Sequence, residues 1–398
     1  MLRLVRDRFS RASLTALLAA GALLPACGGG RGGGIVATAA GRPEPSWSAS
    51  IAARRVRILL AEGFSQIAVE ESRYGPRVQA VAAAGGISLR DPSGRELASG
   101  DGFRLDPAPG RLIRVEGRTY RGSVEVFVNP LRVAVAVNET GLEDYLRGVV
   151  ANELSPRLFP QPEAQKAQAV AARTYAVSGL RGQARRGFDL FADQRSQVFG
   201  GLQGEDPVSD LAIAQTRGTI AVYRGSPIAA FYSSTCGGKT ANYTDFFQGG
   251  EIPYLKGGVE CRDSSSRYHR WKEKVRIADI QASLDRYAAV GRLKSLKIGR
   301  RGPDGRVLEM DFEGPAGTNT LKGFDLRFAL GLRSNWITKM TPERDGEGFL
   351  RAVTVEGAGF GHGVGLCQIG AVELARNGVR HDQILRRYYP GIELSRVY

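Results

Sequence analysis

One glutamate in this sequence combines an acidic side chain with an apolar helical setting, a combination that suits proton transfer at neutral pH. Glu153 follows Leu146 by seven residues and Val149 by four, so a helix would place its carboxyl group beside an apolar face. A carboxyl group among apolar side chains keeps its proton to higher pH, because desolvation disfavours the charged form. Such a group can act as a general acid. The alternative is a solvated surface glutamate, the usual state of this residue on a helix.

Two helices with a short break between them, within residues 141–182, are expected to position this carboxyl group. Ser155 ends the first helix, because a residue before proline, here Pro156, is pushed out of the α region. Pro162 suits the first position of the second helix, whose Ala- and Gln-rich sequence favours helix, and Gly179 is a candidate end. Small residues on the second helix form a stripe that would let another element approach closely: Ala164, Ala167, Ala171 and Thr174.

The segments NELSP and QPEAQKAQAVAARTYA of these helices resemble the core motif of the stage II sporulation protein D family, which includes the amidase enhancers. The resemblance implies a lytic transglycosylase of peptidoglycan, with Glu153 as its catalytic acid. Ordinary glycosidases use two carboxylates. The resemblance implies that one is enough, because the C6 hydroxyl of N-acetylmuramic acid attacks the anomeric carbon and forms a 1,6-anhydro ring. Arg173 and Tyr175 on the second helix are expected to hold the sugar, with a packing role as the alternative.

Two further segments resemble the family and supply candidate substrate contacts. In FADQRSQVFGG, Gln197, Phe199 and Gly200 match the family pattern, and Gln197 is expected to hydrogen-bond a sugar or to cap the local structure. In the closing Gly-rich segment GAGFGHGVGLCQIGA, His362 and Gln368 match. Both are expected to contact sugar from a loop that leads into a helix at about Gln368. A structural hydrogen bond is the alternative for His362.

A third segment, FYSSTCGG at residues 231–238, resembles one in which relatives place a histidine and a cysteine to bind zinc. Ser233 replaces that histidine here, so we expect no metal and no other cofactor. We expect Cys236 and Cys261 to form a disulfide in an oxidising compartment, which would stabilise the fold by about 3 kcal/mol. Cys367 is then left unpaired as a small buried apolar side chain.

Two rival functions remain open at this point. The first is a non-catalytic glycan-binding protein or an activator of an N-acetylmuramoyl-L-alanine amidase, as some members of the family are described. The second is a cysteine hydrolase that uses Cys367 with His362, although the sequence offers no evident acid to orient the histidine.

The N-terminal residues predict export and a lipid anchor. Residues 1–27 begin with several arginines, and their apolar run Leu14–Leu24 is too short to span a bilayer comfortably. The run ends in LPAC, which resembles a bacterial lipobox. The resemblance implies lipid modification of Cys27 and a membrane-anchored protein facing the cell wall or periplasm, with ordinary signal cleavage as the alternative. Residues 28–50 are rich in Gly, Ala, Pro and Ser, as in a flexible tether.

The composition favours an acidic polymer as the partner. The chain has 398 residues, is 42% hydrophobic and carries a formal net charge of +15. The basic residues are spread along the chain, and no nucleic-acid-binding motif accompanies them. We therefore expect peptidoglycan glycan strands and a membrane as partners, a cell-wall amidase as a further candidate, and no nucleic acid.

Periodicity and turn residues predict an α+β fold for residues 51–398. Its expected parts are a β-rich region 51–140, catalytic helices 141–182, an inserted α+β part 270–341 and the closing Gly-rich motif 357–391. Within the β-rich region the expected strands are Val56–Ala61, Gln66–Glu71, Gly86–Arg90, Leu112–Glu116, Ser123–Asn129 and Leu131–Val137. Farther on, helices are expected over 206–216 and 277–290 and strands over 219–222, 228–232, 293–300 and 306–312. Residues 320–332 are expected to shape one wall of a cleft.

Overall fold

The computed structural model describes residues 3–5, 55–71, 77–180, 182–247 and 249–398. The predicted lipidation site Cys27, the tether 28–50 and all of the predicted export signal except residues 3–5 lie outside this part of the chain. The described residues form a mixed α+β fold, as the sequence predicts. None of the helices in these ranges is long and apolar enough to cross a membrane.

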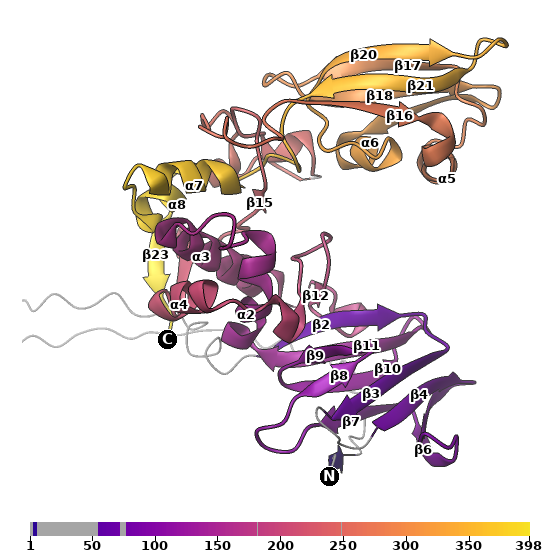
Figure 1. Ribbon diagram of the computed structural model, residues 1–398, viewed down its shortest axis with the longest axis vertical. Helices are drawn as coiled ribbons and strands as arrows, with labels where there is room; N and C mark the ends of the chain where they lie inside the picture. Colours follow the sequence, from indigo (N-terminus) through magenta and orange to yellow (C-terminus); the bar gives the residue numbers. More distant parts are fainter. Residues whose placement is uncertain (1–2, 6–54, 72–76, 181, 248) are drawn as a thin grey trace, which may run out of the picture.

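Two six-stranded sheets form the N-terminal part and occupy the foot of Figure 1. The first has the order β1 (Arg3–Val5), β7 (Gly102–Asp106), β10 (Ser123–Val128), β11 (Ala134–Gly141), β2 (Arg55–Glu62) and β12 (Leu190–Phe191). The second has the order β6 (Glu96–Gly100), β5 (Gly86–Arg90), β4 (Arg77–Ala83), β3 (Gln66–Glu71), β8 (Ile113–Val115) and β9 (Arg118–Tyr120). All neighbours are antiparallel except β2 and β12. Alternating apolar residues of both sheets enter one core, which Leu146 and Val149 of the first helix also join.

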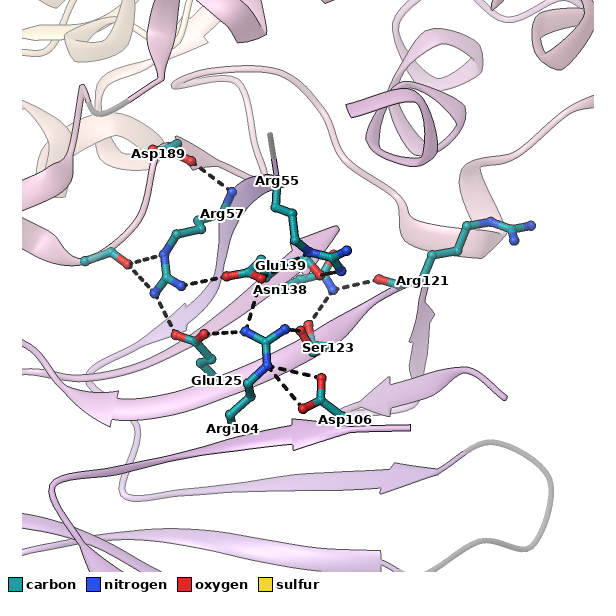
Figure 2. A network of polar contacts seen from close by, with 11 residues as sticks. Arg55, Arg57, Arg104, Asp106, Arg121, Ser123, Glu125, Asn138, Glu139 and Asp189 are labelled. Carbon is teal, nitrogen blue, oxygen red and sulfur yellow. Dashed lines mark hydrogen bonds and ion pairs between the residues drawn. The ribbon is translucent and has the colours of Figure 1, made fainter. Parts of the chain in front are cut away.

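A paired network of charges covers part of the first sheet (Figure 2). Arg104 contacts Glu125 at 2.9 Å and Glu139 at 3.1 Å, and Arg57 contacts the same two carboxylates at 2.8 and 3.0 Å. The backbone N–H of Arg57 also donates to Asp189 at 3.0 Å. These partly buried charges are therefore compensated, and the network ties the segment before β12 to the sheet.

Five helices form the middle of the molecule (Figure 1): α2 (Leu142–Glu153), α3 (Pro162–Gly179), α4 (Pro207–Gln215), α7 (Gln368–Arg376) and α8 (His381–Tyr388). The predicted two-helix arrangement is confirmed, with Pro162 in the first turn of α3 and Gly179 as its last residue. Helix α3 is central, since it contacts α2, α4, α7 and α8 and strand β13 (Thr219–Tyr223). Its small residues allow these close approaches, and the predicted stripe is fully buried.

The inserted part lies at the opposite end of the molecule from the two N-terminal sheets (Figure 1) and has its own apolar core. Its first sheet has the order β16 (Trp271–Arg276), β21 (Leu350–Gly357) and β20 (Ile337–Arg344). Its second has the order β17 (Ser295–Arg301), β18 (Val307–Gly314) and β19 (Gly317–Lys322). Two helices complete it, α5 (Ile277–Tyr287) and α6 (Gly323–Ala329).

Four further short strands lie outside the two N-terminal sheets and the inserted part. They are β14 (Ser226–Pro227), β15 (Tyr232–Ser233), β22 (Leu366–Cys367) and β23 (Glu393–Arg396). Strand β15 runs parallel to β22, while β14 and β23 flank β13. The predicted continuous strand over 228–232 is wrong, because this stretch leaves β14 and turns before it pairs with β22.

The structure corrects our expectation that Arg173 of α3 holds a sugar. Its side chain is 0% exposed, and its guanidinium makes two 2.8 Å contacts with the carboxylate of Glu143 in α2. It also donates to the backbone carbonyls of Ile213 and Thr219, each at 3.2 Å. All of these partners belong to the protein interior, so Arg173 fastens α3 to α2, α4 and β13.

Replacing Arg173 should therefore cost stability. Arg173→Ala leaves the carboxylate of Glu143 partly buried without its cation, which we expect to lower the free energy of unfolding by about 3–5 kcal/mol. Chemical denaturation followed by circular dichroism measures the change. The matched control is Arg276→Ala, since that arginine is 71% exposed in its pair with Asp279 and should contribute less than about 0.5 kcal/mol. Equal effects of the two substitutions would contradict this role.

Candidate functional site

A cleft of about 420 Å³ lies between the end of α2 and the inserted part. Glu153 is the last residue of α2 and lines this cleft, so the break before α3 opens the helix end toward it. Asn152 of the same helix also lines the cleft, and the remaining lining residues come from five further segments: Tyr175; Gln194, Arg195, Ser196 and Val198; Phe231, Tyr232, Ser233, Ser234 and Phe247; Arg327 and Phe328; and Phe360, Gly361, His362 and Gln368. Mostly apolar walls with a few convergent polar groups are typical of ligand sites.

The surroundings of the Glu153 carboxyl group favour its protonated form. Burial raises the pKa of Glu153 above its ordinary value, and three hydrogen bonds to the carboxylate oppose part of that rise. The backbone N–H of Val198 is one of the three donors and lies 2.7 Å from Oε1. The negative end of the α2 dipole further disfavours the charged form, because Glu153 sits at the C-terminal end of the helix.

A chain of buried hydrogen bonds orients the second donor, the hydroxyl of Tyr232. Tyr145 donates to Oε1 of Gln197 at 3.0 Å, and Nε2 of Gln197 lies 2.8 Å from the Tyr232 hydroxyl oxygen. Because that oxygen accepts from Gln197, its own proton is free to point at Glu153, with which it hydrogen-bonds. Gln197 is 0% exposed, so the structure corrects our expectation that it binds sugar and supports the structural alternative.

Gln368 supplies the third donor to Glu153. It is the first residue of α7, as the sequence predicts, and its side chain lines the cleft while remaining 5% exposed. Its Nε2 also lies 3.3 Å from Oε1 of Gln168 on α3. Gln368 therefore joins the closing motif to α3, and its side chain lies beside the carboxyl group of Glu153.

The ring of His362 lines the cleft, while its nitrogens hydrogen-bond to backbone groups of the protein. Nδ1 accepts the backbone N–H of Val364 at 2.9 Å, and the ring also hydrogen-bonds the carbonyl of Tyr232. Burial lowers the pKa of His362 to about 3, so the ring is neutral at physiological pH. This arrangement matches the structural alternative for His362 and leaves its ring surface as the part that can meet a ligand.

Aromatic rings form a wall beside Glu153. Tyr175, a predicted sugar contact, lines the cleft and packs edge-on against Phe231 with ring centres 5.9 Å apart. Phe231 in turn stacks on Phe247 at 4.7 Å, and both rings meet His362 edge-on. Sequence reasoning missed Phe247, because it lies in a stretch without a recognised motif.

The inserted part supplies the opposite wall through α6. Arg327 and Phe328 line the cleft, which confirms the expectation that residues 320–332 shape a wall. The guanidinium of Arg327 lies 5.3 Å from the ring centre of Phe328 and 5.7 Å from that of Phe360. Burial lowers the pKa of Arg327 from its ordinary value. The sequence predicted this segment as a wall but did not single out Arg327 within it.

The cysteines depart from the predicted pairing. Cys236, Cys261 and Cys367 are all buried free thiols in the structure, so the expected disulfide between the first two is not formed there. Cys367 is 0% exposed, as expected of a buried apolar side chain. Its sulfur meets groups of Ser234, Cys236, Asp263 and Gly370 beneath the cleft wall. This burial argues against the cysteine-hydrolase alternative, which needs an accessible thiol.

Comparisons with known proteins find sequences similar to this chain. A family model described as stage II sporulation protein covers residues 132–223, which include Glu153 and Gln197, and a domain of unknown function covers 254–365. Stage II sporulation protein D of Bacillus subtilis is 33% identical over 303 residues, 69% of this chain and 82% of that protein. An uncharacterised protein of Brachyspira hyodysenteriae is 32% identical over 296 residues, 74% of each chain. The amidase enhancer of Bacillus subtilis is 26% identical over 346 residues, 74% of this chain and 47% of that protein.

The raised pKa of Glu153 predicts a pH-dependent cost to stability. Below the pKa of an unfolded glutamate the side chain is protonated in both states, so there is no cost. As pH rises through the interval up to the folded-state pKa, the unfolded chain ionises first and stability falls. Glu153→Gln should therefore raise Tm more at about pH 7 than at about pH 4. Thermal unfolding of both proteins across this range measures the difference. A constant difference, or a lower Tm for the variant at neutral pH, would contradict the raised pKa.

Proposed function

This chain belongs to the stage II sporulation protein D family, and on that premise we propose that it is a lytic transglycosylase that cleaves the glycan strands of peptidoglycan. The observation that carries the proposal is the carboxyl group of Glu153, held in a cleft with a raised pKa and with three hydrogen-bond donors beside it. The names of the relatives, a sporulation protein and an amidase enhancer, support a role at the bacterial cell wall.

The walls of the cleft suit an acidic sugar polymer. Stacked rings of Phe231 and Phe247 offer apolar surface to the C–H groups of a sugar, and Tyr175 packs edge-on against Phe231. Arg327 lines the cleft as well, and a cation there favours a ligand that carries carboxylates, whereas Arg195, which also lines it, is paired with Asp193 at 2.7 Å. The formal net charge of +15 on the whole protein also favours binding of an acidic polymer.

In the first proposed step Glu153 donates its proton to the glycosidic oxygen between N-acetylmuramic acid and N-acetylglucosamine. The C1–O bond breaks, and the leaving sugar departs with the proton. Glu153 then becomes a carboxylate, and the donors from Val198, Tyr232 and Gln368 stabilise the new charge. Burial thus keeps Glu153 protonated before the reaction, and the hydrogen bonds stabilise its carboxylate afterwards.

In the second step the C6 hydroxyl of the muramic acid attacks its own C1 and forms the 1,6-anhydro ring. The Glu153 carboxylate takes the proton of that hydroxyl, which restores the acid and consumes no water. An internal nucleophile gains a large proximity advantage, so no second carboxylate is needed. Tyr175 and the aromatic wall hold the sugar in this scheme.

We further propose that the protein works outside the cytoplasmic membrane. The supporting observations are the arginine-rich start, the short apolar run and the LPAC sequence that ends in Cys27. A lipid at Cys27 and a flexible tether over 28–50 would let the folded part reach glycan strands while it stays attached to a membrane.

A second candidate function is the activation of a cell-wall amidase, which the similarity to the amidase enhancer favours. This chain spans about half of that relative, so the comparison supports the shared region alone. The two functions separate experimentally, because activation by binding does not need the acidity of Glu153.

Glu153→Gln is the direct test of the lytic reaction. The amide can still accept the N–H of Val198 but cannot donate a carboxylic proton, so turnover should fall by roughly 10²–10⁴-fold. Mass spectrometry of 1,6-anhydro products from purified glycan strands measures the loss. Glu251→Gln, which neutralises a carboxylate that is 70% exposed in the chain, is the matched control and should retain full activity. Formation of the 1,6-anhydro product by Glu153→Gln would remove this residue from the mechanism. If wild-type protein forms no such product and both wild type and Glu153→Gln bind the amidase equally, the second function is favoured.

Tyr232→Phe tests the tuning of the acid. The Tyr232 hydroxyl stabilises the carboxylate form, so its loss should raise the pKa of Glu153 further and move the alkaline limb of the pH–rate profile to higher pH. We also expect several-fold lower kcat, because the charge formed on Glu153 loses a donor. Tyr254→Phe, which removes a hydroxyl that accepts the N–H of Ala229 outside the cleft, should leave the profile unchanged. A limb that stays in place or moves to lower pH would show that Tyr232 does not tune the acid.

A further inference from the structure

A row of alternating arginine and aromatic side chains leads out of the cleft along the inserted part. We call it the arginine–aromatic row, and its members in order of contact are Arg267, Tyr268, Arg333, Phe360, Arg327 and Phe328. The last three line the cleft, and the first three lie outside it. None of the six residues is buried. The row therefore offers a continuous surface to a ligand that is longer than the cleft.

Each arginine of the row lies over at least one of its rings. The guanidinium carbons of Arg267 and Arg333 each lie 4.6 Å from the ring centre of Tyr268. Those of Arg333 and Arg327 each lie 5.7 Å from the ring centre of Phe360. The rings of Tyr268 and Phe360 also meet edge-on, with their centres 4.9 Å apart. These distances fall within the range of cation–π contacts, so the rings help to hold the charged groups in place.

Backbone hydrogen bonds fix the segments that carry the middle of the row. The N–H of Gly359 donates to the carbonyl of Tyr268 at 2.8 Å, and the N–H of Gly361 donates to the carbonyl of Arg333 at 2.9 Å. Both neighbours of Phe360 are thereby tied to the segments on which the other members lie. The row is preorganised, so a ligand that binds to it would have little ordering of the protein to bring about.

Two of the three arginines of the row lack a carboxylate partner among the described residues. Arg333 pairs with Glu273, whereas Arg267 and Arg327 make no ion pair in that part of the chain. Nε of Arg327 donates to the carbonyl of Leu332 at 3.1 Å, and its other guanidinium N–H groups have no acceptor there. Uncompensated guanidinium groups attract an anionic ligand, and their planar fork suits the two oxygens of a carboxylate.

We propose that the arginine–aromatic row is a binding track for a carboxylate-bearing glycan strand, whose sugar units beyond the cleaved bond lie along the inserted part. Such a strand presents apolar C–H faces of sugar rings with carboxylates at intervals, and the row presents aromatic rings with cations between them. The carboxylates belong either to the lactyl groups of N-acetylmuramic acid or to peptides attached there. This inference rests on the proposed function and deepens it, because it assigns a long polymer as the substrate and a role to the inserted part.

Continuity with the cleft favours a strand over an anionic membrane as the ligand of the row. Phe360, Arg327 and Phe328 belong both to the row and to the walls of the cleft that Glu153 lines. A polymer with one unit beside Glu153 can pass over the row with its next units. A flat lipid surface could meet the exposed Arg267 but could not follow the row into the cleft.

Binding of purified glycan strands to the full chain tests the track. All proteins carry Glu153→Gln, so that the strands are not consumed. Arg267→Glu reverses an exposed charge at the outer end of the row and should weaken binding of long strands by about 5–10-fold at low ionic strength. It should leave binding of a disaccharide of the same sugars, which reaches least beyond the cleft, unchanged.

The matched control for this test is Arg276→Glu. Arg276 is 71% exposed and ends β16, at the opposite end of that strand from Tyr268, so its reversal makes the same change of charge outside the row. It should bind long strands as the unreversed protein does. Equal affinities of Arg267→Glu and Arg276→Glu for long strands would overturn the proposal.

Strands of matched length with and without peptides identify the carboxylate. A loss of affinity confined to stripped strands assigns the lactyl carboxylates, and a loss confined to peptide-bearing strands assigns the peptide carboxylates; each result supports the track. If Arg267→Glu instead loses binding to phosphatidylglycerol vesicles and binds strands normally, the row is a membrane contact and the proposal is wrong.

The kinetics of the lytic reaction separate this inference from the proposed function. With Glu153 intact, Arg267→Glu should raise KM for long strands about 5–10-fold without a matching fall in kcat, because the row binds ground state and transition state alike. If wild type forms no 1,6-anhydro product while row-dependent binding persists, the lytic function fails and the track stands as a glycan-binding surface. If product forms and the KM values of Arg267→Glu and Arg276→Glu are equal, the track alone fails.

Discussion

The structure depends on a carboxyl group placed where water cannot fully solvate it. Glu153 ends α2 at the floor of a cleft, and burial raises its pKa while three donors limit the rise. Neither effect alone would suit the proposed reaction, in which Glu153 gives up a proton and takes one back. Complete burial without donors would leave the carboxylate too costly to form, and full solvation would leave the group ionised at neutral pH. The surrounding helices and strands maintain this balance between burial of the carboxyl group and hydrogen bonding to it.

Each of the three donors comes from a different part of the chain, and each is fixed by a further contact. The N–H of Val198 belongs to the segment tied back by β12, the Tyr232 hydroxyl is oriented by Gln197, and Gln368 opens α7. Central helix α3 holds these parts together through its small residues, with its one buried cation, Arg173, neutralised by Glu143. The inserted part then adds a wall, so that the acid faces a groove and not open solvent.

Much of the framework was predictable because it follows from local rules. The break after Glu153, the start of α3 at Pro162 and the start of α7 at Gln368 all follow from helix-end chemistry or a recognisable motif. Several strands were missed, among them β4, β6, β7 and β9, whose Ala-, Gly- and Arg-containing sequences carry weak alternation. Residue types also misled the assignment of roles at two positions. Arg173 and Gln197 look suited to binding sugar, but only the tertiary structure shows that their polar atoms are used inside the protein. The meeting of Cys367 with Cys236 and Cys261 is a long-range contact that no local pattern encodes.

The most direct measurement of the central claim is the titration of the Glu153 carboxyl group itself in the otherwise native protein. Infrared difference spectra between wild type and Glu153→Gln across a pH series isolate the C=O stretch of the protonated side chain. The account predicts that this band persists above the pH at which ordinary glutamates ionise and then disappears in one step. A band that is lost at or below the ordinary glutamate pKa would show that Glu153 is a solvated carboxylate and would contradict its assignment as the acid.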